Sequence, residues 1–416
     1  MAHYRALGRL PRQRHTQLRD DDGHLFREEL MGEEGFSSDS SLLYRRGVPS
    51  AITDSQVWEL ADQTRTPNHP LKPRHLKLHD LAFPNSGAGS CPVEGRRLVL
   101  GNNDVRITYV VTGTDASPLY RNAIGDECVF VESGTGVVET VFGVVPYRAG
   151  DYVVVPRATD HRWVPAEPSR LYAIEANSHI HPPKRYLSRF GQLLEHAPYC
   201  ERDLHGPAET FQAEGTDVEV LVKHRTSAGV VGSRLTYATH PFDVVGWDGC
   251  LYPYTFNIED YMPITGKVHQ PPPVHQVFEG WNFVICNFLP RKVDYHDLAI
   301  PVPYYHSNVD SDEVMFYVGG DYEARKGSGI GIGSISLHPG GHAHGPQPSA
   351  IEASLGVQYF DESAVMVDTF APLELGEGGL AVEDPAYAWT WAGRGPSPAS
   401  GPAGDDDGGP AVYSNS

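Results

Sequence analysis

Cysteine, basic residues and long apolar runs are all scarce in this sequence. Its 416 residues include only 5 cysteines, which are widely scattered and form no C-x-x-C pair. That pattern predicts neither a disulfide framework nor a zinc site, and it indicates a reducing cytoplasm. Lys and Arg total 33 against 53 Asp and Glu, and the net charge of -20 argues against nucleic acid or anionic membranes as partners.

Signals for membrane insertion or export are also missing. No stretch reaches the apolar length that a membrane span needs, and the opening MAHYRALGRLPRQRHTQ lacks the apolar centre of a secretory signal. We therefore expect a protein that is neither exported nor anchored. With 40% hydrophobic residues, the chain can still build a substantial core, in two domains or in one large double-layered one.

Dense β-strand signals begin at residue 97. Short runs of β-branched and aromatic residues are separated by Gly, Asp and Pro, a pattern typical of a sandwich or a small barrel. These runs fill residues 97–155, and they resume at 218–288 after a linker-like stretch. Two strand-rich blocks of this kind predict an all-β fold with a duplicated barrel.

The two ends of the chain differ from its middle in composition. The first part is polar and rich in Pro, Asp and His, so we expect an extended arm with a few short strands wrapped over a core. The last part is rich in Gly, Pro and Ala and predicts a disordered tail, apart from Tyr387 and the Trp389/Trp391 neighbourhood, which could dock on the body. The predicted divisions are the arm 1–95, a first barrel 96–210, a second barrel 211–375 and the tail 376–416.

Candidate metal ligands gather in residues 301–348. His306 and Glu313 lie seven residues apart in a segment that alternates like a half-buried strand, and His338 and His344 follow a glycine-studded run suited to tight turns. Two imidazoles and one carboxylate, with the other coordination positions open, form the facial triad that selects non-heme iron(II). The spacing also resembles the cupin barrel. A chance cluster of solvated histidines is the alternative, because the chain holds 20.

Four segments of this stretch carry a more specific signature. They are Tyr304-Tyr305-His306-x-Asn308, Gly320-Asp321-Tyr322-Glu323-Ala324, Ser336-Leu337-His338 and His344-Gly345-Pro346. Together they resemble the active-site signature of the homogentisate 1,2-dioxygenase family. Near the N-terminus, Glu28-Glu29-Leu30-Met31-Gly32-x-x-Gly35-Phe36 is similar to the family's opening segment, so the resemblance covers most of the chain.

The resemblance implies a fold and an activity. We expect tandem cupin barrels, a bicupin, that use Fe(2+) and O2 to cleave the ring of homogentisate in an extradiol-type reaction. The product would be maleylacetoacetate, in tyrosine and phenylalanine catabolism. The family's hexamer implies a homo-oligomer. The alternatives are a dioxygenase for a related hydroquinone acid such as gentisate, or a non-oxygenase metal-binding bicupin with a sugar-binding or storage role.

The resemblance also implies roles for single residues. His306, Glu313 and His344 would bind the metal, but the acidic run is one residue longer than the family pattern, so Asp312 competes with Glu313. Tyr322 and His338 would contact the substrate, as would His344; the alternatives are a packing role for Tyr322 and support of a metal ligand for His338. Arg325 or Lys326 could attract the acidic substrate, or could simply be solvated.

The loop from His269 to His275 carries three consecutive prolines and is expected to cross the mouth of the second barrel. Loops on a rigid barrel commonly carry catalytic groups. The family resemblance makes His275 the candidate base, with His269 as the alternative and a purely structural histidine as a third possibility.

The first barrel lacks a histidine pair. Asn122, Asp126 and Glu127 occupy the region where the first cupin motif would place its ligands, while His161, five residues after Pro156, resembles the second motif. We therefore expect a structural cupin barrel that binds no metal, with His161 packed inside or at the surface.

Overall fold

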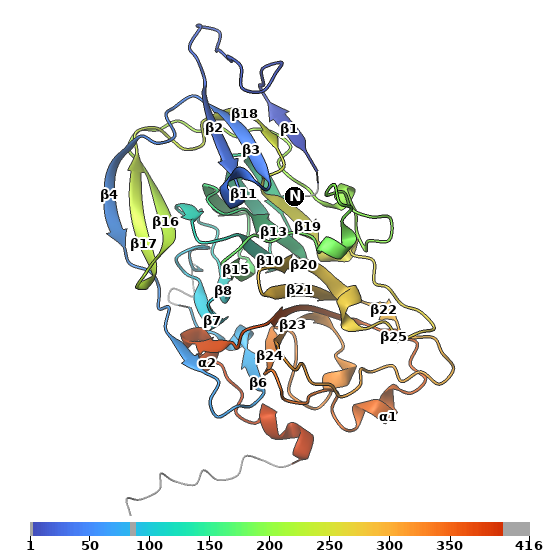
Figure 1. Cartoon of the computed structure of the whole chain (residues 1–416). Helices are drawn as coiled ribbons and strands as arrows, with labels where there is room; N and C mark the ends of the chain where they lie inside the picture. The colour runs from blue at the N-terminus through green and yellow to red at the C-terminus, as the bar shows by residue number, and fades with distance from the viewer. Residues whose placement is uncertain (1–2, 84–88, 394–416) are drawn as a thin grey trace, which may run out of the picture.

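The computed structural model describes residues 3–83 and 89–393. Strands dominate it, and the two α-helices, α1 (Ala350–Ser354) and α2 (Glu377–Ala381), are one turn each. None of the helices in this part of the chain is long and apolar enough to cross a membrane. Figure 1 shows the strands grouped into an upper and a lower body, with β1 (Arg5–Gly8), β2 (Arg27–Gly32) and β3 (Ser40–Arg45) at the top.

Two large sheets form the first barrel. One runs β19 (Tyr254–Asn257), β13 (Asp151–Val155), β10 (Glu127–Ser133), β15 (Arg170–Ala176), β8 (Val105–Val111), β7 (Arg97–Gly101), β27 (Glu374–Gly376) and β5 (Arg65–Pro67). The other runs β12 (Gly143–Tyr147), β11 (Gly136–Thr140), β14 (His161–Pro165), β9 (Leu119–Asn122), β16 (Val218–Thr226), β17 (Gly229–Tyr237) and β4 (Ile52–Trp58). Phe130 and Trp163, from opposite sheets, are buried in one hydrophobic core.

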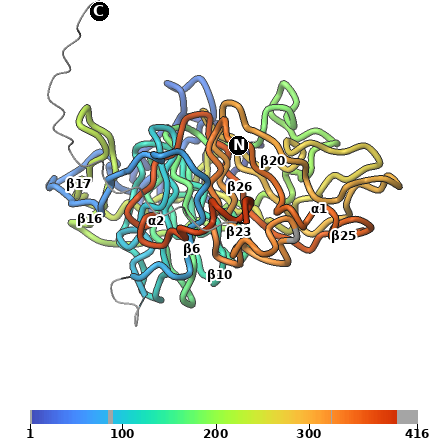
Figure 2. The backbone as a smooth tube through the Cα atoms, turned by 90° about the horizontal axis from the view of Figure 1, so that it is seen from below, coloured from blue at the N-terminus to red at the C-terminus, as the bar shows by residue number. Residues whose placement is uncertain are grey.

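The second barrel is built on a six-stranded sheet. Its strands run β20 (Gln276–Gly280), β21 (Phe283–Phe288), β26 (Glu362–Thr369), β23 (Asp312–Gly320), β24 (Ser334–His338) and β6 (Arg74–Lys77), and β22 (Arg291–Lys292) pairs with β25 (Tyr359–Phe360) beside it. Strand β6 comes from the N-terminal arm and lies against the C-terminal strands in both views (Figure 1 and Figure 2). The predicted all-β tandem-barrel fold is confirmed.

The N-terminal arm adds short strands to the body, as predicted. A four-stranded sheet runs β1 (Arg5–Gly8), β18 (Val244–Gly249), β3 (Ser40–Arg45) and β2 (Arg27–Gly32). Strand β4 closes the edge of the first barrel beside β17, and β5 pairs with β27. The arm is thus held by pairing with strands far along the chain.

The boundary predicted at residue 211 is wrong. Strand β16 pairs in parallel with β9, and β19 pairs with β13, so the strands between residues 218 and 257 belong to the sheets of the first barrel or to the arm's sheet. The alternation of apolar residues identifies a strand but does not say which sheet it joins. Pairing partners over a hundred residues away decide that.

The predicted tail contains ordered structure up to residue 393. Tyr387 begins a short 3-10 helix, Tyr387–Ala392, and its side chain is completely buried. Trp391 Nε1 donates to the carbonyl oxygens of Gly345 and Pro346, each at 3.2 Å. Disorder is therefore wrong for residues 376–393, while the predicted docking of this aromatic group is confirmed; residues 394–416 lie outside the described part of the chain.

Candidate metal centre

Three predicted ligands converge at one end of the second barrel. Glu313 is the second residue of β23, whereas His306 and His344 lie in the loops that precede β23 and follow β24. Two backbone hydrogen bonds fasten these loops together: the His306 N–H donates to the His344 carbonyl at 2.8 Å, and the His344 N–H donates to the His306 carbonyl at 2.9 Å. Positions that are 38 residues apart in sequence are thereby locked side by side.

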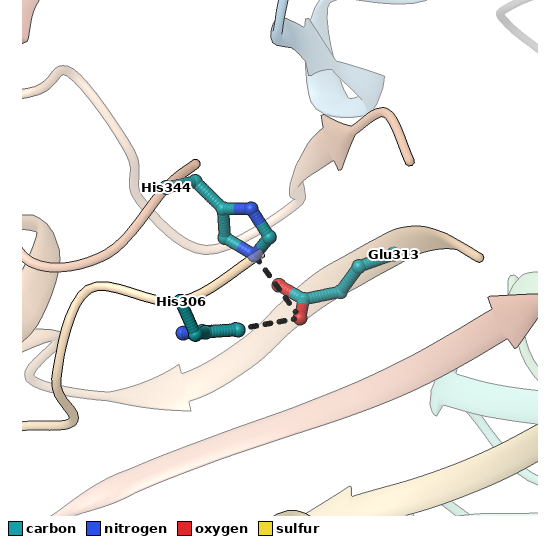
Figure 3. Close-up of side chains that lie close together, drawn as sticks. All are labelled: His306, Glu313 and His344. Atoms are coloured by element: carbon teal, nitrogen blue, oxygen red, sulfur yellow. Dashed lines mark hydrogen bonds and ion pairs between the residues drawn. The ribbon is translucent and has the colours of Figure 1, made fainter. Parts of the chain in front are cut away.

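The side chains of the three residues point toward one another (Figure 3). The Nε2 atoms of His306 and His344 lie 3.5 and 3.3 Å from Oε2 of Glu313. One potential ligand atom from each residue falls within 4.8 Å of the other two. This spacing leaves room for one cation between them.

Backbone carbonyls orient both imidazoles. His306 Nδ1 donates to the carbonyl of Tyr304, and His344 Nδ1 donates to that of His342, each at 3.1 Å. Because a carbonyl oxygen only accepts, Nδ1 carries a proton in both rings, and Nε2 is the nitrogen that faces Glu313. Metal-binding histidines in proteins are oriented in the same way.

The carboxylate of Glu313 is ionised in spite of its burial. Burial alone would raise its pKa, but the neighbouring imidazoles of His306, His338 and His344 bring the pKa well below its usual value. Within the described part of the chain, Glu313 forms no ion pair with lysine or arginine. A buried negative charge surrounded by imidazoles calls for a cation.

Two unpaired atoms support the same conclusion. The buried Nε2 of His344 makes no hydrogen bond, although it lies 3.3 Å from the Glu313 carboxylate. Asp368, opposite Glu313 on β26, also leaves Oδ1 buried without a hydrogen bond. Two imidazole nitrogens and one carboxylate therefore fit a divalent transition metal of the non-heme iron type.

Comparison with known proteins identifies the family. The sequence profile of the homogentisate 1,2-dioxygenase N-terminal domain matches residues 33–258, and that of the C-terminal domain matches residues 267–394. The chain belongs to the homogentisate 1,2-dioxygenase family. It is thus an enzyme of this dioxygenase type, and the predicted family resemblance is confirmed.

Individual relatives agree with this family. The chain is 38% identical over 395 residues, 94% of its length, to a protein of Saccharolobus solfataricus named "putative dioxygenase", of which the match covers 99%. It is 26% identical over 309 residues to the homogentisate 1,2-dioxygenase of Emericella nidulans, covering 70% of this chain and 64% of that one. The corresponding enzyme of Bradyrhizobium diazoefficiens is 28% identical over 256 residues, covering 59% of this chain and 54% of that one.

Solved structures similar to this chain include cupins. A cupin 2 conserved barrel protein of Leptotrichia buccalis matches 74% of this chain and 99% of its own, with a TM-score of 0.32 and 10% identity. A mutant oxalate decarboxylase of Bacillus subtilis matches 76% of this chain and 82% of its own, with a TM-score of 0.34 and 12% identity.

The competition between Asp312 and Glu313 has a clear structural outcome. Asp312 accepts two backbone N–H groups, from Gly340 to Oδ1 and from Leu373 to Oδ2, each at 2.7 Å. Its carboxylate is therefore committed to tying the strand ends together. Glu313 is the neighbour that faces the imidazoles, so in this member of the homogentisate 1,2-dioxygenase family the extra acidic residue does not displace the candidate ligand.

His338 supports Glu313 from the buried side. Its Nδ1 lies 3.1 Å from Oε1 of Glu313, and its Nε2 lies 3.0 Å from the Tyr387 hydroxyl. Burial lowers the pKa of His338 to about 3, so the ring is neutral. A neutral ring that donates from Nδ1 to the carboxylate accepts from Tyr387 at Nε2. The arrangement matches the predicted alternative in which His338 orients a metal ligand.

The hydroxyl of Tyr322 is occupied by two hydrogen bonds with the backbone. Its hydroxyl accepts from the Gly319 N–H at 2.7 Å and donates to the Ser363 carbonyl at 3.3 Å. The ring packs against Tyr317 in a small buried cluster. In this conformation the Tyr322 hydroxyl holds neighbouring backbone segments together. This agrees with the predicted alternative of a packing role.

The two candidate bases occupy different environments. His275 is buried and stacks on Phe288 at 4.5 Å between ring centroids, and burial together with the nearby Arg291 charge lowers its pKa to about 3. Its Nδ1 has no hydrogen-bond partner. His269 is half exposed, pairs with Asp294 at 2.6 Å and packs against Tyr304, which in turn packs against His306. The sequence could not separate these settings.

Access to the centre lies at the His306 edge. The His306 side chain is 26% exposed, whereas that of His344 is 1% exposed. Tyr304 and Tyr305 are exposed beside it. A separate hollow of about 980 Å³ is lined by Asp312 but by none of the three candidate ligands. The solvent-exposed edge of the centre is therefore the His306 side, next to these two tyrosines.

Sequence reasoning missed two parts of the site. Tyr387 was expected only to dock, yet its hydroxyl contacts His338. Arg325 was expected to be solvated or to attract substrate, but it is partly buried, donates to the Gly345 carbonyl at 2.5 Å and lies 5.9 Å from the Trp391 ring. Aromatic residues in an otherwise Gly- and Pro-rich tail were the one available signal.

Proposed function

We propose that this chain is an iron(II)-dependent ring-cleaving dioxygenase whose substrate is homogentisate. The convergence of His306, Glu313 and His344 within 4.8 Å carries the proposal, because this donor set suits ferrous iron and oxygen chemistry. Membership of the homogentisate 1,2-dioxygenase family supports the substrate. The expected product is maleylacetoacetate, formed in tyrosine and phenylalanine catabolism.

The two imidazoles and the Glu313 carboxylate would hold the metal. When bound, ferrous iron supplies Lewis acidity and electron transfer to dioxygen. The carbonyls of Tyr304 and His342 keep both Nε2 atoms directed at the centre. His338 restrains the carboxylate, and a restrained ligand set needs little reorganisation during the reaction.

Ring cleavage also requires a proton to leave the substrate hydroxyl. A neutral imidazole is the ordinary acceptor for such a proton. His275 remains our candidate base by family resemblance, although burial lowers its pKa and makes it a weaker base than an exposed imidazole, and His269 remains the alternative. Tyr304 and Tyr305 offer aromatic surface at the exposed edge of the centre for a substrate ring.

The compartment and the assembly remain predictions. All five cysteines are free thiols, which suits the predicted reducing cytoplasm. The homo-oligomer, a hexamer by family resemblance, and the absence of nucleic-acid or membrane partners are likewise proposed on the sequence alone.

Oxygen consumption with two substrates tests this function. The metal-free protein is loaded with Fe(II) or with Zn(II), and oxygen uptake is followed with homogentisate and with gentisate. We expect uptake with Fe(II) and homogentisate and none with Zn(II). Faster uptake with gentisate would reassign the substrate, and metal binding without any uptake would favour a non-oxygenase bicupin.

A single variant ties the metal to the activity. His344→Ala removes one imidazole from a buried position and should lose iron and oxygen uptake together while the fold is retained. His342→Ala, two residues away and exposed, is the matched control and should keep both. Full activity in His344→Ala would end the assignment of the three ligands.

A further inference from the structure

The first barrel repeats the candidate metal centre position by position. Backbone pairing defines the match, because corresponding residues occupy corresponding places in the two sheets. The matching pairs are Tyr120 with His306, Glu127 with Glu313, Val155 with His338, His161 with His344 and Glu175 with Asp368.

The carboxylates illustrate the match in the sheets. Glu127 lies opposite Val155 on one neighbouring strand and opposite Glu175 on the other. Its counterpart in the second barrel lies opposite His338 and Asp368. In each barrel, the strand next to the one that carries the central glutamate thus places an acidic residue directly opposite it: Glu175 on β15 and Asp368 on β26.

The histidines match in their hydrogen bonds. His161 lies opposite Tyr120 across β14 and β9, as His344 lies opposite His306. Its Nδ1 donates to the carbonyl of Thr159 at 3.0 Å, two residues earlier, which is the bond that His344 makes to its own chain. His161 is completely buried, and its Nε2 has no hydrogen-bond partner.

The acidic residue before each glutamate also matches. Asp126 accepts the N–H of Arg157 at 2.7 Å and that of Ile180 at 2.8 Å. Asp312 accepts from Gly340 and Leu373. Arg157 and Gly340 each directly follow a proline, and Ile180 and Leu373 each lie five residues after the acid that pairs with the central glutamate, Glu175 or Asp368. Asp126 also lies near Glu33 and His179, but its two oxygens already serve this structural purpose.

Two basic side chains of the first barrel, Arg96 and Lys223, pair with its acidic residues, whereas in the described part of the chain Glu313 pairs only with histidines. Arg96 enters the first barrel just before β7, and its side chain is 5% exposed. Its Nη1 donates to Glu127 at 2.8 Å and to Glu175 at 3.2 Å. The Tyr120 hydroxyl donates to the other oxygen of Glu127 at 2.9 Å. Lys223 forms an ion pair with Glu175. The carboxylates of this barrel are therefore neutralised by side chains.

We propose that the first barrel contains a copy of the metal centre that no longer binds metal, in which the Arg96 guanidinium replaces the metal ion and Tyr120 replaces one imidazole ligand. Glu127 and His161 remain in place as two latent ligands. The site thus belongs to the class that takes divalent transition metals by nitrogen and carboxylate oxygen, and it is closed by a permanent internal cation.

The space around Arg96 agrees with a closed site. The adjoining cavity measures about 40 Å³ and is covered by Trp58 and Gln63 from the arm. Organic ligands generally occupy pockets of roughly 300–1,000 Å³, whereas a polar cavity of this size suits a few waters. The cavity beside Arg96 is therefore too small for a substrate.

Restoring the missing ligand should reopen the site to metal. The double variant Arg96→Ala, Tyr120→His removes the internal cation and adds an imidazole opposite His161. After loading with cobalt(II), we expect one more metal ion per chain than in the wild type, and unfolding at a higher temperature with cobalt than without it. The measured quantity is the number of metal ions bound per chain in the variant minus that in the wild type, so the result does not depend on whether the second barrel holds iron.

The matched control is Arg96→Ala, Tyr120→Phe, which removes the same cation without supplying a ligand. It should bind no additional cobalt. The proposal is overturned if the double variant folds and binds no more metal than wild type, or if the control binds as much as the double variant. Loss of metal from His161→Ala in an otherwise wild-type chain would also overturn it.

A second comparison decides the matter if neither variant folds. Arg96→Met leaves Glu127 buried without its cation, and Arg96→Met with Glu127→Gln removes both charges. We expect the second protein to unfold at a clearly higher denaturant concentration than the first. Equal midpoints would show that the guanidinium does not act as the counter-charge of Glu127.

Discussion

Asp312 and Glu313 are adjacent on β23, and their carboxylates contact different groups. Asp312 accepts the backbone N–H groups of Gly340 and Leu373, whereas Glu313 faces three imidazoles. Alternate residues of a strand point to opposite faces, so one of the pair must hold the loops while the other reaches the centre.

Substitution of the two acids should therefore have separate effects. Glu313→Gln is expected to abolish metal retention while the fold persists, because the amide removes the negative ligand. Asp312→Asn should retain metal but lower the free energy of unfolding by about 1–3 kcal/mol, since one of two buried N–H groups loses its charged acceptor. Metal content and denaturant unfolding measure the two effects, and metal loss in Asp312→Asn alone would reverse the assignment.

Tyr387→Phe tests the support that the C-terminal segment gives to the centre. The ring would still pack, but His338 Nε2 would lose its hydroxyl donor at 3.0 Å. Loss of such an outer contact commonly weakens metal affinity by about 10–100-fold, and we expect the lower end of that range. Competition with a chelator measures the affinity. The exposed Tyr359→Phe provides the control and should leave it unchanged.

Buried neutral histidines should make the metal-free protein sensitive to acid. Burial lowers the pKa of His75 to about 4 and that of His275 to about 3, whereas both rings in the unfolded chain titrate near 6.5. Below pH 6.5 the unfolded state binds protons that the folded state does not, so stability is fully present above pH 6.5 and falls as the pH approaches 4 and then 3. The limiting slope is about 1.4 kcal/mol per pH unit for each histidine.

Denaturant unfolding at a series of pH values between 7 and about 4 measures this slope. His275→Gln should flatten it, because the substituted side chain binds no proton in either state. The exposed His196→Gln should leave it as in wild type. A slope that His275→Gln does not change would mean that this ring takes up its proton inside the folded protein.

Much of the centre could be predicted because its ligands are local in sequence. His306, Glu313, His338 and His344 fall within one short stretch, and strand alternation and glycine-rich turns bring such residues together. The choice between Asp312 and Glu313 could not be made, since it depends on backbone groups of Gly340 and on a loop beyond residue 370.

The parts that escaped prediction are those set by distant pairing. Strand β16 joins β9 in parallel about a hundred residues away, which no local pattern reveals. Arg96 is likewise unremarkable in sequence, because its meaning comes from Glu127 and Glu175 on two other strands. The contact between Tyr387 and His338 joins residues 49 positions apart, so no local pattern indicates it either.

The two candidate bases can be separated by their own substitutions. His275→Asn removes a buried neutral ring whose Nδ1 is free, and if this ring takes the substrate proton, kcat should fall by about 10²–10⁴-fold. Iron content should be unchanged, because His275 is not one of the three candidate ligands. His269→Ala alters an exposed ring paired with Asp294 and should change kcat by only a few-fold. Iron content and oxygen uptake are measured together for both variants. A large loss of kcat in His269→Ala, with His275→Asn near wild type, would assign the base to the exposed loop position beside Tyr304 instead.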